Sequence, residues 1–467
     1  MTAPEPPAAL GSASGGLLRP LLADAAIDAG LSDSALLQAM LDVERELAGV
    51  LAELGVVPAE AAAAIAAASH AERYDIGALG RAGVTDGNPV PALVRELTAA
   101  VPPACRPWVH HGATSQDILD TALMLLARNA GATTAAAVEA AADTCADLAL
   151  AHRATLMPAR TLGQQALPTT FGLKAAGWMS GLDASATRLR QVLDEALAVQ
   201  LGGAVGTLAG LGDAGPALVA GLASRLDLAE PVLAWHTDRQ RILELGAALA
   251  AVVAASGKVA LDVELLAQTE VGEVVLDGAG GSSAMPHKRN PVPAVLIRAA
   301  AVRAPGLLAT LHAAAVQEHE RAAGGWHAEW DVLRELLSLA GGAAARLAAL
   351  LPVLLVDAAR MRANLDATGG LSLSQAVATR LSPSFGRTAA HEVVRRCARL
   401  SAETGQAFRT VLLDDAQVRA VLSEHDVDAA LDPAGWLGST DALIERALTD
   451  HRYRRAGQPS NPTTGQP

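Results

Sequence analysis

Five segments of this chain are compatible with unusually long α-helices, and they constrain the fold more than any other feature. Each is 24 to 39 residues long, and Gly- or Pro-containing breaks separate them. Such lengths exceed those of ordinary globular helices and predict an elongated helix bundle. No alternating strand and helix pattern accompanies them. The segments are Asp117–Thr155, Leu173–Ala198, Arg239–Gln268, Pro291–Glu320 and Ala328–Leu351.

Shorter helical segments flank the predicted bundle. Ser32–Leu54 carries apolar residues at helical spacing, Pro58–Ala68 is rich in alanine, and a turn at Asp86–Pro89 opens a third helix. Shorter helices return between Pro352 and Arg454. The sequence therefore predicts an all-α protein in which a central long-helix bundle lies between two smaller helical domains.

We expect the domain boundaries to follow these changes in helix length. The N-terminal helical domain covers residues 1–105 after a flexible start, the central bundle 106–352 and the C-terminal helical domain 353–455. Residues 456–467 are polar and rich in Pro, Gly and Thr, which predicts a disordered tail.

The composition indicates how such helices pack. Hydrophobic residues make up 51% of the chain, but aromatic residues only 2%, so the core consists mainly of Ala, Leu and Val. Small side chains let helices approach closely. Long Ala-rich helices cannot bury their apolar stripes within one thin layer. We therefore expect bundles of different subunits to associate.

Charge and cysteine usage limit the partners and the compartment. A net charge of -13 argues against nucleic acid, although a local basic pocket could still bind a small anion. The three cysteines have no metal-ligand spacing and suit a reducing compartment. Met1–Gly16 lacks the basic start of a signal peptide, and Ala61–Ala68 is too short to span a membrane. These features predict a soluble cytoplasmic protein.

A glycine-rich stretch carries the strongest chemical signal. Asp277–Gly280 leads into the string GSSAMPHKRNP at Gly281–Pro291, which combines small residues with hydroxyls, a lysine and an asparagine. Glycines allow a backbone to approach a ligand closely. Asn290 and Pro291 are suited to the N-cap and the first position of a helix, whose N-terminus favours anions. Local chemistry alone leaves a surface linker as an alternative.

This string closely resembles the signature loop of the fumarase/aspartase superfamily, which includes adenylosuccinate lyases and 3-carboxy-cis,cis-muconate cycloisomerases. The resemblance implies a three-domain, all-α fold with a central bundle. It also implies a homotetramer whose active sites each draw residues from three subunits. Neither a metal nor a redox cofactor is expected.

The resemblance assigns roles to residues of the loop. Ser282 acts on the carbon next to a substrate carboxylate, while Lys288 and Asn290 hold that carboxylate as it becomes an aci-carboxylate. Ser283 is expected to bind substrate beside them. A serine can do this only as an activated alkoxide in a closed, dry loop, and the glycines would permit closure.

The stretch Trp108–Thr121 resembles the first conserved region of the superfamily, in which a Thr-Ser pair contacts substrate carboxylate. Thr114 and Asp117 have the spacing of a capping box, and capping alone could explain Asp117. Ser115 lies beside free helix N–H groups and is a candidate substrate ligand with Thr114. His110 and His111 could titrate usefully or simply pack in the loop.

The second conserved region reads Arg-Thr-His-Gly-Gln in adenylosuccinate lyases, and Arg160–Gln164 resembles it with Leu162 at the histidine position. Leucine has no proton to give, so the general acid of those lyases is missing. This departure favours the cycloisomerase branch. Gln164 is a candidate substrate contact, with a buried brace between helices as the alternative.

Two further stretches bear on the substrate. In Gln317–Trp330, Trp326 and Trp330 stand where adenylosuccinate lyases supply Ser and Arg to a nucleotide phosphate, which implies a smaller substrate. Arg321 is a candidate carboxylate clamp, with an ion pair to Glu318 or Glu320 as the alternative. In Trp235–Arg241, Asp238 and Gln240 are exchanged relative to the family pattern, and a solvated charged face is favoured there.

The resemblance therefore implies a cycloisomerase of protocatechuate breakdown, the β-ketoadipate pathway, that closes 3-carboxy-cis,cis-muconate to a lactone by intramolecular carboxylate addition. The alternative is β-elimination from a succinyl-type compound, which could be adenylosuccinate-like or a nitro- or amino-succinate. A third possibility is a non-catalytic structural protein on the same scaffold. Such a protein has no need to keep Ser282, Lys288 and Asn290 together.

Overall fold

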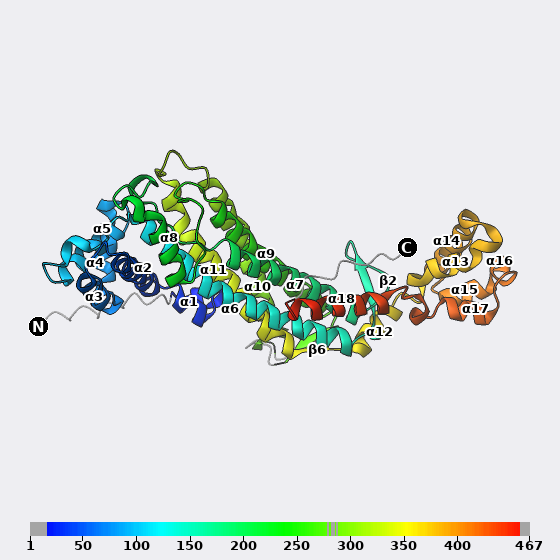
Figure 1. Cartoon of the computed structure of the whole chain (residues 1–467). Coiled ribbons are helices and arrows are strands. Elements are labelled where there is room, and N and C mark those ends of the chain that lie inside the picture. Colours follow the sequence, from blue (N-terminus) through cyan, green and yellow to red (C-terminus); the bar gives the residue numbers. More distant parts are fainter. Residues whose placement is uncertain (1–15, 278–279, 282–284, 286–287, 458–467) are drawn as a thin grey trace, which may run out of the picture. The chain divides into compact units, whose positions relative to one another are not determined.

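A computed structural model describes residues 16–277, 280–281, 285 and 288–457 (Figure 1). The expected flexible start, Ser282, Ser283 and nearly all of the expected tail lie outside the described residues. The chain divides into two compact units. Unit 1 comprises residues 1–139, 184–257 and 296–347, and unit 2 comprises 140–183, 258–295 and 348–467. The three-domain division stays a prediction.

Three short helices of unit 1, which begin at Asp33, Ala59 and Val90, start where the sequence predicts, and the other short helices of this unit were not predicted. Helix α2 covers Asp33–Glu53, and the Ser32 side chain caps it by accepting a hydrogen bond from Ala35 N. Its buried face includes Leu37, Met40 and Leu47. The other short helices of this unit are α1 (Ala25–Gly30), α3 (Ala59–Ala68), α4 (Ile76–Asp86), α5 (Val90–Ala100) and α8 (Gly215–Leu226).

All five predicted long helices are present, which confirms the all-α class. Their ends differ from the predicted ends by a few residues, as expected where helices fray. The helices are α6 (Ser115–Ala151), α7 (Phe171–Glu195), α9 (Gln240–Leu266), α10 (Val292–Ala314) and α11 (Gly325–Leu350).

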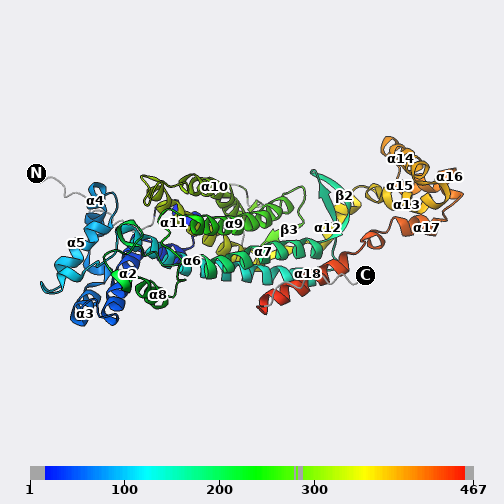
Figure 2. The same cartoon turned by 45° about the horizontal axis from the view of Figure 1, so that its top comes forward.

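Small residues bring the long helices of unit 1 into close contact, and α9, α10 and α11 lie side by side there (Figures 1 and 2). A Cβ added at Gly246 of α9 would meet Leu311 of α10 at 2.7 Å. A Cβ at Gly257 would meet Ala301 of α10 at 2.7 Å as well. A side chain at Gly257 would therefore push the two helices apart, whereas one at Gly246 would first displace the end of the Leu311 side chain, and both contacts agree with packing through small residues.

Unit 2 contains a β-hairpin that the sequence analysis did not predict. Strands β1 (Leu156–Thr161) and β2 (Gln164–Thr170) pair antiparallel, and Leu162 and Gly163 form the two-residue turn. Both turn residues have positive φ, 52° and 78°, as two-residue hairpin turns require. Two smaller antiparallel pairs join β3 (Val274–Leu276) to β6 (Leu354–Val356) and β4 (Gly280–Gly281) to β5 (Arg289–Asn290).

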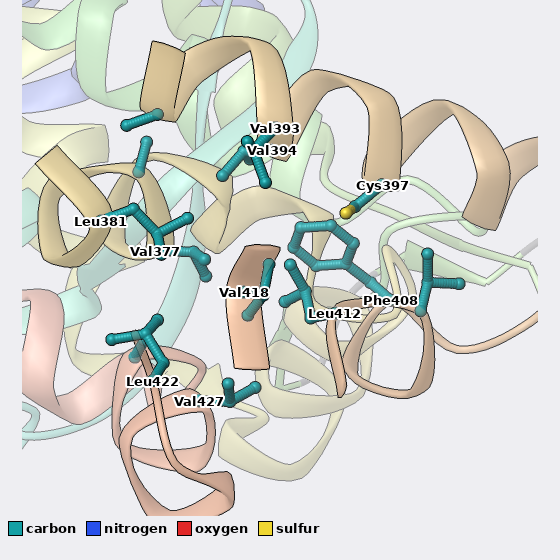
Figure 3. Packing of buried hydrophobic residues seen from close by; sticks show 14 residues of the cluster. Val377, Leu381, Val393, Val394, Cys397, Phe408, Leu412, Val418, Leu422 and Val427 are labelled. Carbon is teal, nitrogen blue, oxygen red and sulfur yellow. The ribbon is translucent and has the colours of Figure 1, made fainter. Parts of the chain in front are cut away.

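The C-terminal helices of unit 2 enclose an aliphatic cluster around Phe408 (Figure 3). Phe408 is fully buried and lies beside Cys397 and Leu412 in this cluster. Cys397, like Cys105 and Cys145, is a free buried thiol. The cluster lies among α13 (Ser374–Phe385), α14 (Arg387–Thr404), α15 (Phe408–Asp414), α16 (Ala416–Arg419) and α17 (Glu424–Ala430). The other helices in this part of unit 2 are α12 (Ala358–Asp366) and α18 (Thr440–Arg455).

Three helical stretches are long and apolar enough, by length and composition alone, to cross a membrane. They are Gln240–Leu266, Val292–Ala314 and Gly325–Val353, and 50%, 28% and 67% of their most apolar windows are buried inside the protein. Much of the apolar surface of α10 is thus open to solvent in the single chain.

We expect Phe408→Ala to destabilise the C-terminal cluster by about 3–5 kcal/mol, because it leaves a cavity in a fully buried site. Leu400→Ala is the control, since Leu400 lies on α14 with 45% of its surface exposed. Hydrogen exchange of the α13 and α14 amides measures the change. Equal losses in the two variants would show that Phe408 does not organise this cluster.

Candidate active site

The start of α6 brings two of the predicted substrate ligands together in unit 1. Thr114 precedes the helix and Ser115 is its first residue, and both side chains are half-buried. Asp117 Oδ2 accepts a hydrogen bond from Thr114 N at 3.0 Å, which is one half of the predicted capping box. Neither hydroxyl is hydrogen-bonded to another described residue. Both are therefore available to a ligand at the positive end of a long helix.

Asp117 does more than cap this helix. Its carboxylate is buried and accepts hydrogen bonds from Gly202 N at 3.0 Å, Gly203 N at 2.9 Å and the ring Nε2 of His236 at 2.7 Å. Four donors therefore converge on a single side chain. They attach the Gly202–Gly203 turn and the segment before α9 to the start of α6. Asp117 therefore joins three segments of the chain in addition to capping α6.

Arg321 lies against the same glycine turn. Its guanidinium donates to Ala204 O at 2.8 Å and to Gly203 O at 3.4 Å. The alternative ion pair to Glu318 or Glu320 is not formed, and Glu318 instead accepts from Ala323 N at 2.9 Å. The two backbone contacts use only Nη2 of the guanidinium, so its other N–H groups could still bind a carboxylate. The carboxylate clamp by Arg321 stays a prediction.

His110 is paired with a buried carboxylate on α2. Its Nδ1 lies 2.6 Å from Glu44 Oε1, and the Glu44 side chain is only 1% exposed. Burial of the ring lowers the pKa of His110, but the charge and hydrogen bond of Glu44, with a contribution from Asp117, raise it by more. The net pKa of His110 therefore lies above its ordinary value.

A fully buried ion-pair network lies behind the start of α6. Arg239 Nη1 donates to Asp120 Oδ2 at 2.8 Å, and Arg239 Nη2 donates to Glu329 Oε2 at 2.6 Å. All three side chains are at most 2% exposed. Burial lowers the pKa of Arg239, but the two carboxylates raise it by more, so the guanidinium stays charged. Burial also raises the pKa of Glu329, despite Arg239.

The network also includes Trp326, the tryptophan expected to replace a phosphate ligand of adenylosuccinate lyases. Trp326 is buried, and its Nε1 donates to Asp120 Oδ1 at 2.8 Å. Its ring meets that of Trp330 edge to face, with centroids 4.7 Å apart. Trp326 therefore belongs to the buried network. Its only hydrogen-bond donor is committed to Asp120.

The exchanged residues Asp238 and Gln240 are both exposed, which agrees with the favoured solvated face. Asp238 Oδ1 accepts from Gln240 N at 3.2 Å, at the start of α9. The neighbouring Arg239, in contrast, is fully buried. Within this stretch Asp238 and Gln240 thus lie at the surface, whereas Arg239 lies in the core.

The remaining predicted ligands belong to unit 2. Gln164 is exposed at the start of β2, beside the Leu162–Gly163 turn, so the alternative of a buried brace is wrong. Leu162 itself is fully exposed. Behind the turn, Arg160 forms a two-point ion pair with the buried carboxylate of Glu273 at 2.6 and 2.9 Å. This pair attaches β1 to the segment before β3.

The described part of the signature loop lines a cavity. Lys288 is exposed and Asn290 half-buried, and both border a space of about 610 Å³ with Glu264, Gln268 and Thr269. Asn290 lies in β5 and pairs with Gly280, and Pro291 O accepts from Val295 N as α10 begins. The predicted N-cap at Asn290 is therefore wrong, because strand pairing holds that residue. Ser282 and Ser283 lie outside the described residues.

Sequence reasoning missed the buried charged groups Glu44, Asp120, His236, Arg239 and Glu329. One signal was available: Glu44, Asp120 and Glu329 stand on faces that helical periodicity assigns to the core. A charge on such a face needs a buried partner. Periodicity does not identify that partner, however, because the partner residue lies about 70 to 210 positions away along the chain.

Comparisons with known proteins agree on one family. Residues 23–306 match the family described as lyase, and residues 370–447 match the one described as adenylosuccinate lyase C-terminus. A nitrosuccinate lyase of Streptomyces davaonensis is 46% identical over 447 residues, 93% of this chain and 94% of that protein. A 3-carboxy-cis,cis-muconate cycloisomerase of Pseudomonas aeruginosa is 46% identical over 426 residues, 90% of this chain and 93% of that protein.

A solved structure supports the same relationship. The crystal structure of 3-carboxy-cis,cis-muconate lactonizing enzyme from Pseudomonas putida superposes with a TM-score of 0.90 at 41% identity. The match covers 94% of this chain and 100% of that one. The likeness thus extends over nearly the whole fold.

We expect Arg239→Gln to destabilise unit 1 by about 3–5 kcal/mol, because it leaves two carboxylates buried without their cation. Arg241→Gln is the control: among the described residues Arg241 donates only to the backbone carbonyls of Glu195 and Ala196, so its loss should cost about 1 kcal/mol. Urea unfolding measures both changes.

Glu329→Gln separates charge from packing in the same network. It keeps the size of the side chain and leaves one cation with one carboxylate, so it should cost less than half as much as Arg239→Gln. An equal or larger loss for Glu329→Gln would contradict the charge balance described above.

Proposed function

The chain belongs to the lyase family of the fumarase/aspartase superfamily, and from this premise we propose that it is a 3-carboxy-cis,cis-muconate cycloisomerase. Relatives of that activity match it over most of its length. The substrate carries three carboxylates and no phosphate. The product is a carboxymuconolactone.

The main support for this proposal is that two positions at which adenylosuccinate lyases have nucleotide-specific residues lack that chemistry in this chain. Leu162 occupies the place of the general-acid histidine of adenylosuccinate lyases, fully exposed at the hairpin turn. Trp326 occupies the place of a phosphate ligand, and Asp120 takes its only donor. Both support a small, phosphate-free substrate.

The reaction needs one bond-forming step and one proton. A substrate carboxylate adds through oxygen to the conjugated double bond, and the electron pair moves to the carbon next to another carboxylate. Lys288 and Asn290 stabilise the resulting aci-carboxylate. The Ser282 hydroxyl then gives its proton to that carbon, and solvent restores the proton to Ser282. The reverse reaction removes the same proton.

Thr114 and Ser115 supply the other half of substrate binding. Their hydroxyls and the amide groups at the start of α6 can hold a second substrate carboxylate. Ser283, Gln164 and Arg321 complete the proposed ligands. Each is a donor suited to a carboxylate oxygen.

We also propose that the enzyme is a cytoplasmic homotetramer in which each active site takes residues from several subunits. The exposed apolar side chains of α10 support this, because such surface favours contact with another protein surface. Val302 is 77% exposed and Val295 49% exposed, although both lie on a long helix. The proposed pathway is protocatechuate breakdown.

A second candidate is elimination from nitrosuccinate. The relative from Streptomyces davaonensis supports it, since its identity to this chain equals that of the Pseudomonas aeruginosa cycloisomerase. Ser282 would remove a proton next to a carboxylate, and nitrite would leave with the electron pair to give fumarate. Nitrite needs no proton on departure, so Leu162 is compatible with this reaction as well.

The deciding experiment follows two signals in parallel: loss of the conjugated diene of 3-carboxy-cis,cis-muconate, and nitrite release from nitrosuccinate. We expect rapid diene loss that falls at least about a thousandfold in Ser282→Ala, because the proton donor is lost. Ser34→Ala, at an exposed serine, is the control and should keep full activity.

Nitrite release without diene loss would reject the cycloisomerase proposal in favour of the second candidate. Diene loss that persists in Ser282→Ala would keep the reaction but reject the role of Ser282. Inactivity on both substrates would reject both functions.

We expect Ser115→Ala to raise KM about tenfold to a hundredfold with a smaller change in kcat, because a hydroxyl bonded to a carboxylate is lost in the ground and transition states alike. Steady-state kinetics with 3-carboxy-cis,cis-muconate measure this, again with Ser34→Ala as control. An unchanged KM would remove Ser115 from the binding site.

A further inference from the structure

We propose that His110 is a cationic ligand for a substrate carboxylate at the Thr114–Ser115 site, and that buried Glu44 is the positioning residue that holds its ring. This inference rests on the proposed function only in that the substrate is a polycarboxylate. Nothing in the proton transfer by Ser282 depends on it.

The geometry leaves one ring nitrogen free for a ligand. Nδ1 of His110 faces Glu44 Oε1 at 2.6 Å, while Nε2 is not hydrogen-bonded to any described residue. The Glu44 side chain is 1% exposed and the His110 side chain 17% exposed. The carboxylate is therefore sealed inside unit 1, and the ring lies between it and solvent. A group held in this way offers its Nε2–H to a bound anion.

The local backbone gives no reason for a histidine at this position. His110 has a φ of 59°, and a turn follows in which Ala113 N donates to His110 O at 3.4 Å. Glycine or asparagine adopts this conformation more readily. Turn formation alone does not explain why a histidine occupies this position. Its ring and the pairing with Glu44 do.

Charge balance around the start of α6 gives the second argument. The groups that face this region are Glu44 from α2, Asp117 from α6, His236 from the segment before α9 and Arg321 from the loop before α11. Against the one positive charge of Arg321, Asp117 and Glu44 bring two negative charges to a place proposed to bind an anion. A protonated His110 cancels one of them and presents a donor.

Glu44 in turn depends on His110. Its second oxygen, Oε2, is buried and has no hydrogen-bond partner among the described residues. A buried carboxylate with one free oxygen favours a positive charge on its partner, here His110. The pKa of His110 is accordingly raised, chiefly by Glu44 against the opposing effect of burial.

The sign of the pH dependence follows from this raised pKa. His110 keeps its proton below the folded-state pKa and loses it as pH rises through that value. Binding of a polycarboxylate should therefore be strongest at low pH and weaken above the pKa of His110.

Isothermal titration calorimetry with propane-1,2,3-tricarboxylate tests this on the full-length protein from about pH 6 to about pH 9. We expect the wild-type Kd to rise about tenfold across this range, the effect of losing one nearby charge. His110→Asn keeps a side chain that tolerates positive φ and can donate to Glu44, but it is never charged. It should bind weakly at low pH and lose the pH dependence.

Glu44→Gln removes only the positioning charge. It should shift the midpoint of the Kd profile to lower pH, and Glu44→Asp should shift it back toward the wild-type value. His391→Asn, at an exposed histidine of α14, is the control and should leave the profile unchanged. Circular dichroism checks that each variant is folded.

The outcomes separate this inference from the proposed function. A wild-type profile that His110→Asn does not alter, in a folded protein, would overturn the inference even if the enzyme consumes the diene. A profile that disappears in His110→Asn would support it even if the diene assay fails. A profile that Glu44→Gln leaves unshifted would reject the role of Glu44.

Discussion

The buried guanidinium of Arg239 is the interaction on which the architecture of the candidate site depends. It lies between Asp120 on α6 and Glu329 on α11, with all three side chains removed from water. Such a group is stable only with both partners correctly placed, since any displaced partner leaves an unpaired buried charge. The network therefore fixes α6, α11 and the segment that leads into α9 relative to one another. Trp326 and Gln317 satisfy its remaining acceptors.

Asp117, one turn before Asp120 on α6, is likewise a buried carboxylate, but most of its hydrogen bonds come from backbone amides. Its carboxylate gathers amide groups from the start of α6 and from the Gly202–Gly203 turn, together with the ring of His236. The hydroxyls of Thr114 and Ser115 are left free as a result. An aspartate that looked like a simple cap thus orders the binding surface, and a basic group, Arg321, lies against the same turn.

The long apolar helices and the small polar site have a common explanation. Helices built from Ala, Leu and Val pack closely through glycines such as Gly246, which leaves little room for polar groups in the core. The few charges that are buried must therefore pair with one another. Several of them do so near the start of α6, where a helix N-terminus, free hydroxyls and His110 meet, and Glu273 does so with Arg160 in unit 2.

Helix periodicity, capping and the signature loop determined the all-α class, the five long helices and the candidate residues Thr114, Ser115, Lys288 and Asn290. These features are local, because hydrophobic spacing and cap chemistry depend on residues a few positions apart. The tertiary structure alone decided the partners of Asp117, Arg239 and Glu44, and the strand that holds Asn290. Those pairings join residues far apart in the chain, and their energy comes from burial that no local pattern encodes.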